Sequence, residues 1–145
     1  MLAGICLALA AAGAGAPPVF VPATHFTLAW THSIEKVRWE EDYRVAGDGP
    51  GASPVLHAEA ARVRGSGAGM EPPPDARLAE GWYHYRPALA TATELRLTRS
   101  EFTPDYELCL DGRCRPLGHW LASDQGVTLL RPCGAPAPGQ DVAID

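Results

Sequence analysis

His32 and Glu41 interrupt a strand-like alternation of apolar residues, and they are the first candidates for chemistry in this sequence. Because successive residues of a strand face opposite sides of a sheet, residues 26–34 and 39–45 each present one mostly apolar face. A hairpin with its turn centred on residues 36–37 places His32 opposite Glu41. Directly opposed residues have Cβ atoms about 4.5–5.5 Å apart, so an imidazole and a carboxylate would interact there.

The pair of His32 and Glu41 suits two kinds of chemistry, a general base oriented by a carboxylate or two ligands of a metal ion. A metal-assisted hydrolase needs a third ligand, for which His84 is a candidate. The structural alternative is a charge-assisted pair that fixes the hairpin register, and it is favoured because buried polar groups must find partners. Ser33 and Glu35 fall on the opposite face or in the turn, and no Gly-x-Ser-x-Gly surrounds Ser33, which argues against a serine hydrolase.

A glycine-rich segment, Gly65-Ser66-Gly67-Ala68-Gly69, superficially resembles a phosphate cradle. It is followed by Met70, Glu71 and three prolines instead of a helix, and it lacks Lys-Ser/Thr, so neither a P-loop nor a Rossmann turn is supported. A tightly bent or mobile connection is the favoured interpretation. The loop remains the second candidate for a contact surface.

Residues 82–86, with the sequence Trp-Tyr-His-Tyr-Arg, are a third candidate. Aromatic and Arg side chains dominate the energetics of interfaces, so this segment could form a ligand platform or a partner-binding strand. The favoured interpretation is a strand whose aromatic residues pack on both sides of a sheet.

The elements that must position these residues are short strands separated by Gly and Pro. This pattern predicts an all-β fold: a single antiparallel sandwich or small barrel-like domain, with a cysteine-flanked hairpin. One short helical turn is expected within residues 117–121. The expected strands are residues 26–34, 39–45, 55–64, 81–86, 94–102, 106–110 and 127–130.

Residues 1–21 predict a signal peptide or an N-terminal membrane anchor. Residues 1–16 carry no charged side chain and end in Ala-Gly-Ala, a small-x-small pattern that signal peptidase accepts. Prolines interrupt the end of the apolar run, which favours a cleaved signal over a retained anchor. Cys6 lies in this leader, and we expect no structural role for it.

The three later cysteines indicate a disulfide in an oxidising compartment. Asp111-Gly112 is typical of a type I′ turn, which places Cys109 opposite Cys114 in a non-hydrogen-bonded pair suited to a disulfide. The alternative is a bridge from Cys114 to Cys133, which would close a longer loop. Either bridge leaves one thiol, interpreted most simply as a small buried hydrophobe.

Length and charge set the remaining limits. The chain has 145 residues and a net charge of −5 without any Lys/Arg-rich run, which argues against a nucleic-acid partner. We expect one all-β domain over residues 22–133. Residues 134–145 are rich in Pro, Gly, Ala and acidic residues and predict a flexible tail.

The sequence also resembles a known family in three segments: His32-Ser33-Ile34-Glu35, then Trp39-Glu40-Glu41 with Tyr43, then residues 65–70. The chain is similar to a small bacterial family of unknown function, numbered eighteen-fifty among such domains. Its members are encoded beside, or fused to, membrane components of TAXI-type TRAP transporters, which take up small organic solutes. The resemblance implies solute uptake at the cell envelope and supplies no mechanism.

We therefore expect a non-enzymatic accessory or binding protein, periplasmic or anchored at the outer face of the cytoplasmic membrane. Its partners would be TRAP membrane subunits or a solute-binding protein, with membrane contact only through an uncleaved leader, and no cofactor is expected. The alternatives are the metal-assisted hydrolase and a purely structural envelope protein. The expected contact surface comprises His32, Ser33, Glu35, Glu41, Gly65, Gly67 and Gly69.

Overall fold

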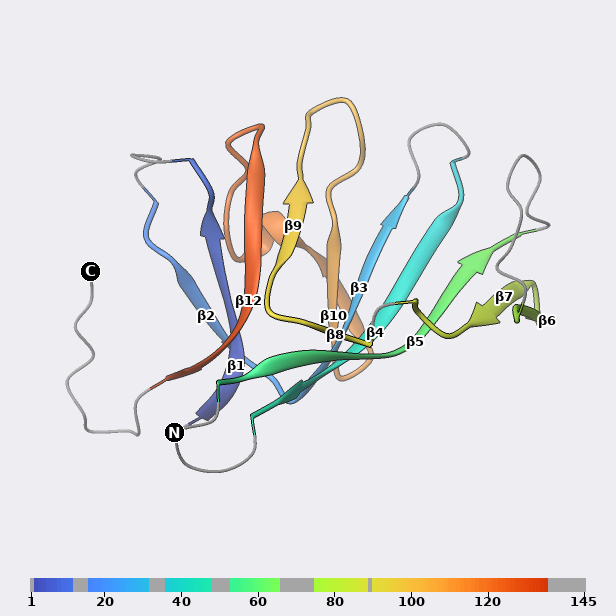
Figure 1. Ribbon diagram of the computed structural model, residues 1–145. Coiled ribbons are helices and arrows are strands. Elements are labelled where there is room, and N and C mark those ends of the chain that lie inside the picture. The colour runs from blue at the N-terminus through green and yellow to red at the C-terminus, as the bar shows by residue number, and fades with distance from the viewer. Residues whose placement is uncertain are drawn as a thin grey trace.

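A computed structural model describes residues 2–11, 16–31, 36–47, 53–65, 75–88 and 90–135. These residues form two antiparallel sheets that share one core (Figure 1). The antiparallel all-β fold that the sequence predicts is therefore confirmed. The elements are β1 (Leu2–Leu9), β2 (Val19–Pro22), β3 (His25–Thr31), β4 (Arg38–Ala46), β5 (Val55–Arg64), β6 (Arg77–Ala79), β7 (Trp82–Tyr85), β8 (Thr91–Ala92), β9 (Leu95–Thr98), β10 (Glu107–Leu110), β11 (Arg113–Pro116), the 3-10 turn η1 (Leu117–His119) and β12 (Val127–Ala135).

The smaller sheet has the strand order β2-β1-β12-β9, and the larger sheet has the order β11-β10-β3-β4-β5-β7-β6, with β8 paired to β5. Alternate residues of each strand point into the space between the sheets, as the period of two requires. The core is built in this way from Ile5 and Leu7 of β1, Leu130 of β12, and Leu28 and Leu108 of the larger sheet, all at most 2% exposed. The two sheets are thus held together mainly by burial of apolar area.

The role of Cys6 is the first correction to the sequence analysis. In this structure residues 2–9, which belong to the segment interpreted above as a leader, form β1, which pairs with β12 on one side and β2 on the other. Cys6, for which no role was expected, forms a disulfide with Cys133. The expected leftover thiol is wrong, because none of the four cysteines is free. The alternative Cys114–Cys133 bridge is also wrong, because Cys133 is bonded to Cys6 and Cys114 is bonded to Cys109.

The cysteine-flanked hairpin is confirmed in register and in turn type. Cys109 lies opposite Cys114 and Leu110 lies opposite Arg113, and the two sulfurs form a disulfide. Asp111 and Gly112 have φ angles of 51° and 80°, the positive values that a type I′ turn requires at both central positions.

The register of the first hairpin is the second correction. β3 pairs with β4 so that Trp30 lies opposite Trp39 and Leu28 lies opposite Glu41. Glu41 therefore does not lie opposite His32, whose own position falls outside the described residues. The two strands do present the faces that were predicted, since Trp30, Trp39 and Glu41 share one side of the sheet.

Other expectations fare as follows. The strand predicted over residues 55–64 is β5, and the helical turn predicted within residues 117–121 is η1. The last strand is longer than predicted, because β12 continues to Ala135. The remaining residues of the expected tail, 136–145, lie outside the part of the chain that the structure describes.

A buried ion pair fixes the connection between the two sheets after β9. Arg99 is 3% exposed, and its guanidinium donates to both carboxylate oxygens of Asp105, at 3.0 and 2.9 Å, and to Thr128 of β12. Asp105 also accepts the backbone N–H of Gly118 beside η1. Because a buried charge needs a full set of partners, this cluster rigidifies the segment that carries Tyr106 towards the core.

Candidate functional site

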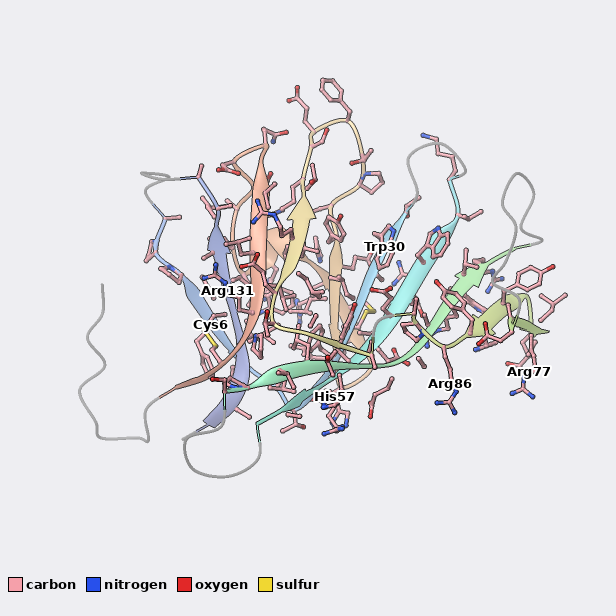
Figure 2. All side chains as sticks on the ribbon, viewed as in Figure 1. Cys6, Trp30, His57, Arg77, Arg86 and Arg131 are labelled. Carbon is pink, nitrogen blue, oxygen red and sulfur yellow. A yellow bond between two sulfur atoms is a disulfide. The ribbon has the colours of Figure 1, made fainter. Side chains whose placement is uncertain are left out.

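β4 crosses the middle of the larger sheet and sends neighbouring acidic residues to opposite sides. Glu40 and Asp42 face the outer side, and Glu41 and Tyr43 face the inner side, as strand alternation requires. Figure 2 shows the two sides: Trp30 lies on the concave side of the larger sheet, whereas His57 and Arg77 project from the opposite side. The site is best described one side at a time.

On the inner side, a recess of about 280 Å³ lies between β9 and the strands β3 and β4. Its walls are mainly apolar and aromatic. We call it the inner recess, and it is lined by Leu28, Trp30, Glu41, Tyr43, Leu95, Arg96, Leu97 and Tyr106.

Among the described residues that line the inner recess, Glu41 is the only acidic one. Its Oε1 accepts a hydrogen bond of 2.6 Å from the hydroxyl of Tyr43, which is 6% exposed. Burial raises the pKa of the Tyr43 phenol, and the hydrogen bond to Glu41 and the negative charge of Glu41 raise it further. Burial and the charge of Glu41 likewise raise the pKa of Tyr85 to about 12. Burial and, after it, the charge of Glu41 therefore hold these two phenols in their neutral form.

The aromatic rings around Glu41 contact one another in sequence. Trp30 stacks on Trp39, with centroids 6.2 Å apart and an interplanar angle of 7°, and it meets Tyr106 at 6.2 Å with a tilt of 48°. Trp39 meets Tyr85 edge-on at 6.4 Å. Such contacts contribute beyond simple burial and keep the rings in place. Trp30 and Tyr106 thereby form a preorganised aromatic wall of the inner recess.

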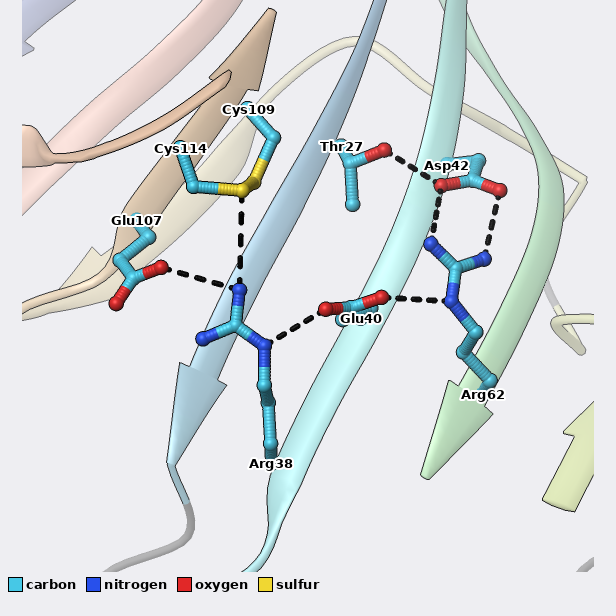
Figure 3. Close-up of a disulfide and its surroundings, with 8 residues drawn as sticks. All are labelled: Thr27, Arg38, Glu40, Asp42, Arg62, Glu107, Cys109 and Cys114. Carbon is cyan, nitrogen blue, oxygen red and sulfur yellow. Dashed lines mark hydrogen bonds and ion pairs between the residues drawn. A yellow bond between two sulfur atoms is a disulfide. The ribbon is translucent and has the colours of Figure 1, made fainter. Parts of the chain in front are cut away.

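The outer side of the same strands carries a row of paired charges, shown in Figure 3, which we call the outer charge ladder. Arg38 donates to Glu40 Oε2 at 2.7 Å, and Arg62 donates to Glu40 Oε1 at 2.6 Å. Arg62 also contacts both oxygens of Asp42, at 2.9 and 3.2 Å. Thr27 completes the row with a hydrogen bond of 2.6 Å to Asp42.

The electrostatics of the outer charge ladder favour the ionised forms. Burial disfavours the charge on Glu40, but the hydrogen bonds from Arg38 and Arg62 outweigh burial and hold the Glu40 pKa below its ordinary value. The pKa of Asp42 is lowered in the same way, with burial outweighed by Arg62 and Thr27. The hydrogen bond to Asp42 and then that to Glu40 raise the Arg62 pKa against burial. The ladder is therefore a stabilising network whose charges are already compensated.

Only part of the predicted contact surface can be placed. Glu41 lies in the inner recess, and Gly65 follows β5 with a φ of +102°, a left-handed conformation that favours glycine. The other members of the surface lie outside the described residues: His32, Ser33, Glu35, Gly67 and Gly69.

His84 does not join Glu41. His84 lies on β7 opposite Arg62, on the outer side, whereas Glu41 lies opposite Ala61 and faces inward. The sheet separates the two side chains, so they cannot ligate one metal ion, and the third ligand suggested for a hydrolase is wrong. Within the described ranges, the only close group of three potential metal-ligating residues is Glu107, Cys109 and Cys114, and its sulfurs are bonded to each other.

Residues 82–85 of the aromatic segment form β7, as the strand interpretation predicted, and Arg86 follows the strand. Its two sides differ. Tyr85 packs against Trp39 on the inner side, and Trp82 lies under the guanidinium of Arg64, 5.2 Å from the ring centroid, on the outer side. β7 thus contributes Tyr85 to the aromatic cluster on the inner side, but none of its residues lines the inner recess.

Sequence reasoning missed half of the inner recess. Residues 95–97 and Tyr106 lie more than fifty positions after Glu41 in the sequence, and no local pattern marks them as neighbours of Glu41. The one available indication was the acidic residue on an otherwise apolar face, which did identify Glu41.

Comparison with known proteins places the chain in a family. A family model described as "Domain of unknown function (DUF1850)" matches residues 26–117, which is more than half of the chain. The chain belongs to the DUF1850 family. The family indicated by the sequence resemblance is therefore confirmed. No curated protein and no solved structure matches the chain. The DUF1850 match begins in β3 and ends in η1, so it contains the whole lining of the inner recess and the whole outer charge ladder.

Proposed function

We propose that this chain is a non-enzymatic binding module of the cell envelope that takes a small organic cation into the inner recess and serves solute uptake. The observation that carries the proposal is Glu41, a carboxylate placed among the aromatic walls of an open recess. Concave, mainly apolar sites with a few polar groups are the usual form of small-molecule sites.

The size and chemistry of the inner recess suggest the ligand. A volume of about 280 Å³ suits a small solute. The faces of Trp30 and Tyr106 attract cations through their π electrons, and Glu41 supplies the opposite charge. Arg96 also lines the recess, but its side chain is 61% exposed and is paired with Glu94 at 3.4 Å. The hydroxyl of Tyr43 holds one oxygen of Glu41, and among the described residues no other side chain hydrogen-bonds to this carboxylate. An ammonium group can therefore bind Glu41 while its carbon substituents contact the aromatic rings.

The proposed location follows from the cysteines. Two disulfides indicate an oxidising, extracytoplasmic compartment. The described part of the chain contains no helix with the length and hydropathy of a membrane span. A periplasmic position, next to TRAP membrane subunits or their solute-binding protein, is our proposal for the site of action, in line with the context that the family resemblance implies.

Binding is tested by calorimetry with tetramethylammonium and n-butylammonium, using n-butanol as the uncharged control. We expect the two cations to bind and n-butanol not to bind. Glu41→Gln should weaken cation binding at least about tenfold, since a charge-assisted contact is lost. The matched control is Glu40→Gln, which changes the neighbouring acid on the outer side and should leave binding unchanged. Equal binding by wild type and Glu41→Gln, or no cation binding at all, would refute the proposal.

The role in uptake requires a separate test in cells. Deleting the gene while keeping the transporter genes intact should reduce uptake of the cationic solute, and the Glu41→Gln gene should fail to restore it. Unchanged uptake after deletion would contradict the accessory role even if the isolated domain binds cations.

A further inference from the structure

The hairpin disulfide lies at the end of the outer charge ladder, and its surroundings differ from those of an inert cross-link. Arg38 Nη2 lies 3.9 Å from Cys114 Sγ and 3.0 Å from an oxygen of Glu107 (Figure 3). Cys114 belongs to the edge strand β11, all four residues of which are exposed, whereas Cys109 is only 8% exposed. Cys114 is therefore the more exposed of the two cysteines, and its sulfur lies near the guanidinium of Arg38.

We propose that Cys109–Cys114 is an exchangeable disulfide, reduced by dithiols while the domain stays folded, and that Arg38 is the residue that promotes the exchange. This inference does not depend on the proposed ligand in the inner recess, because that recess lies on the other side of the sheet.

The site gives a reductant room to approach. Cys109 and Cys114 both line an open depression of about 540 Å³ on the outer side, together with Asp111 and Gly112 of the turn and residues of the outer charge ladder. A small dithiol can therefore reach Cys114 from the solvent without opening the core.

The exchange proceeds in two balanced steps. A thiolate of the dithiol attacks Cys114 Sγ, forms a mixed disulfide and releases Cys109 as a thiolate, which takes a proton. The second thiolate of the reductant then attacks the reductant sulfur that is bonded to Cys114. This step closes the reductant into a cyclic disulfide and releases Cys114 as a thiolate. Two electrons pass to the protein. The guanidinium of Arg38, 3.9 Å from Cys114 Sγ, attracts the incoming thiolate to this sulfur in the first step, and it stabilises the Cys114 thiolate that departs in the second step.

The other disulfide serves as an internal reference. Cys6 and Cys133 are separated by 127 positions and join the two central strands of the smaller sheet, whereas Cys109 and Cys114 are separated by 5 positions. In the chain-entropy model a long closed loop stabilises the fold more than a short one. The hairpin ladder between β10 and β11 also remains when the short bridge is broken. Reduction of Cys109–Cys114 therefore costs the fold little.

The test treats the folded protein with dithiothreitol, quenches with iodoacetamide at intervals, and locates the alkylated cysteines by peptide mass spectrometry. Circular dichroism reports whether the fold persists. We expect Cys109 and Cys114 to become alkylated while Cys6 and Cys133 stay bonded and the spectrum is unchanged. Equal rates for the two disulfides, or no reduction of Cys109–Cys114 before denaturant unfolds the protein, would overturn the proposal.

Variants separate the role of Arg38 from simple exposure. Arg38→Gln should slow the reduction about three- to tenfold, and Arg38→Lys should restore most of the rate. Glu107→Gln should accelerate it, because Glu107 competes for the same Nη2 and adds a negative charge near the sulfur. Arg115→Gln is the matched control, since Arg115 is next to Cys114 on β11 but points to the other side of the strand. A purely structural role of Arg38 predicts no acceleration in Glu107→Gln, and that result would also overturn the proposal.

Discussion

Glu40 and Glu41 are adjacent in the sequence and have the same side chain, but they lie in opposite environments. Glu40 is held between Arg38 and Arg62 on the outer side, with its two oxygens 2.7 and 2.6 Å from guanidinium nitrogens. Glu41 faces an apolar recess and accepts a hydrogen bond from Tyr43. The difference comes only from strand alternation, which sends successive residues to opposite faces.

This comparison indicates how one strand can serve stability and recognition at once. A carboxylate whose charge is compensated by two arginines attracts a cationic ligand only weakly. Its removal leaves the two guanidinium groups without the partner that they share. A carboxylate among aromatic rings contributes less to the fold and more to selectivity for a cation. The following changes test that division, beginning with the largest expected effect.

Arg62→Met should break the outer charge ladder most severely, because Arg62 is shared by Glu40 and Asp42. We expect the free energy of unfolding to fall by about 2 kcal/mol, between the values typical of exposed and of buried ion pairs, since its side chain is 23% exposed. Arg64→Met on the same strand and face is the control and should cost less than about 1 kcal/mol. Urea denaturation measures both. Equal losses would show that the ladder contributes no more than an exposed charge.

Glu40→Gln should lower stability by about 1 kcal/mol at neutral pH, because two charge-assisted hydrogen bonds become ordinary ones. It should also change the response to acid. The pKa of Glu40 in the folded protein lies below its ordinary value of 4.5. The stability that ionised Glu40 contributes is therefore fully present above pH 4.5 and is lost as the pH falls through the pKa of the folded state.

Urea midpoints of wild type and Glu40→Gln between pH 7 and pH 3 test this pH dependence. The wild type should lose stability steadily below about pH 4.5, and the variant should lose less over the same interval. Parallel curves for the two proteins would contradict the assignment of a lowered pKa to Glu40.

Tyr43→Phe should lower the free energy of unfolding by up to about 1 kcal/mol, because it removes the hydroxyl that donates to Glu41 while keeping the ring stacked on Phe26. Loss of this donor leaves Glu41 freer to move. We therefore expect weaker binding of n-butylammonium than in wild type by calorimetry. Unchanged affinity would mean that Tyr43 does not orient Glu41.

Glu41→Gln should have the smallest effect on folding, below about 0.5 kcal/mol, although it should have the largest effect on cation binding. Its partner in the comparison, Glu40→Gln, should show the reverse order of effects. Measuring unfolding and binding for both variants therefore tests the division directly. A loss of stability in Glu41→Gln that equals the loss in Glu40→Gln would remove the distinction between the two sides of β4.

The faces of the strands could be predicted from the sequence, whereas their register could not. Alternation correctly grouped Trp30, Trp39 and Glu41 on one side. The turn between β3 and β4 contains no Asn-Gly or Asp-Gly to fix its length, in contrast to Asp111-Gly112, where both turn and register were predicted correctly. In the observed register Trp30 stacks on Trp39, a side-chain contact that local turn rules do not specify.

The strand β1 could not be predicted for a different reason. A strand at the centre of a sheet and the apolar core of a signal peptide have the same composition, because both must avoid charged side chains. In this structure Ile5 and Leu7 are fully buried, and they pair with a strand at the other end of the sequence, which no local pattern indicates. The inner recess could not be derived for the same reason, since Leu95 and Tyr106 reach Glu41 only through the tertiary fold.

The bond between Cys6 and Cys133 also has a mechanical consequence. It joins β1 to β12 near the two ends of the described chain and closes nearly all of the strands into one covalent ring. A pulling force applied to the chain outside these two cysteines passes through the sulfur–sulfur bond and bypasses the strands between them. The sheets that hold the inner recess and the outer charge ladder would therefore keep their shape under tension along the chain, and they would extend only after this one bond is reduced.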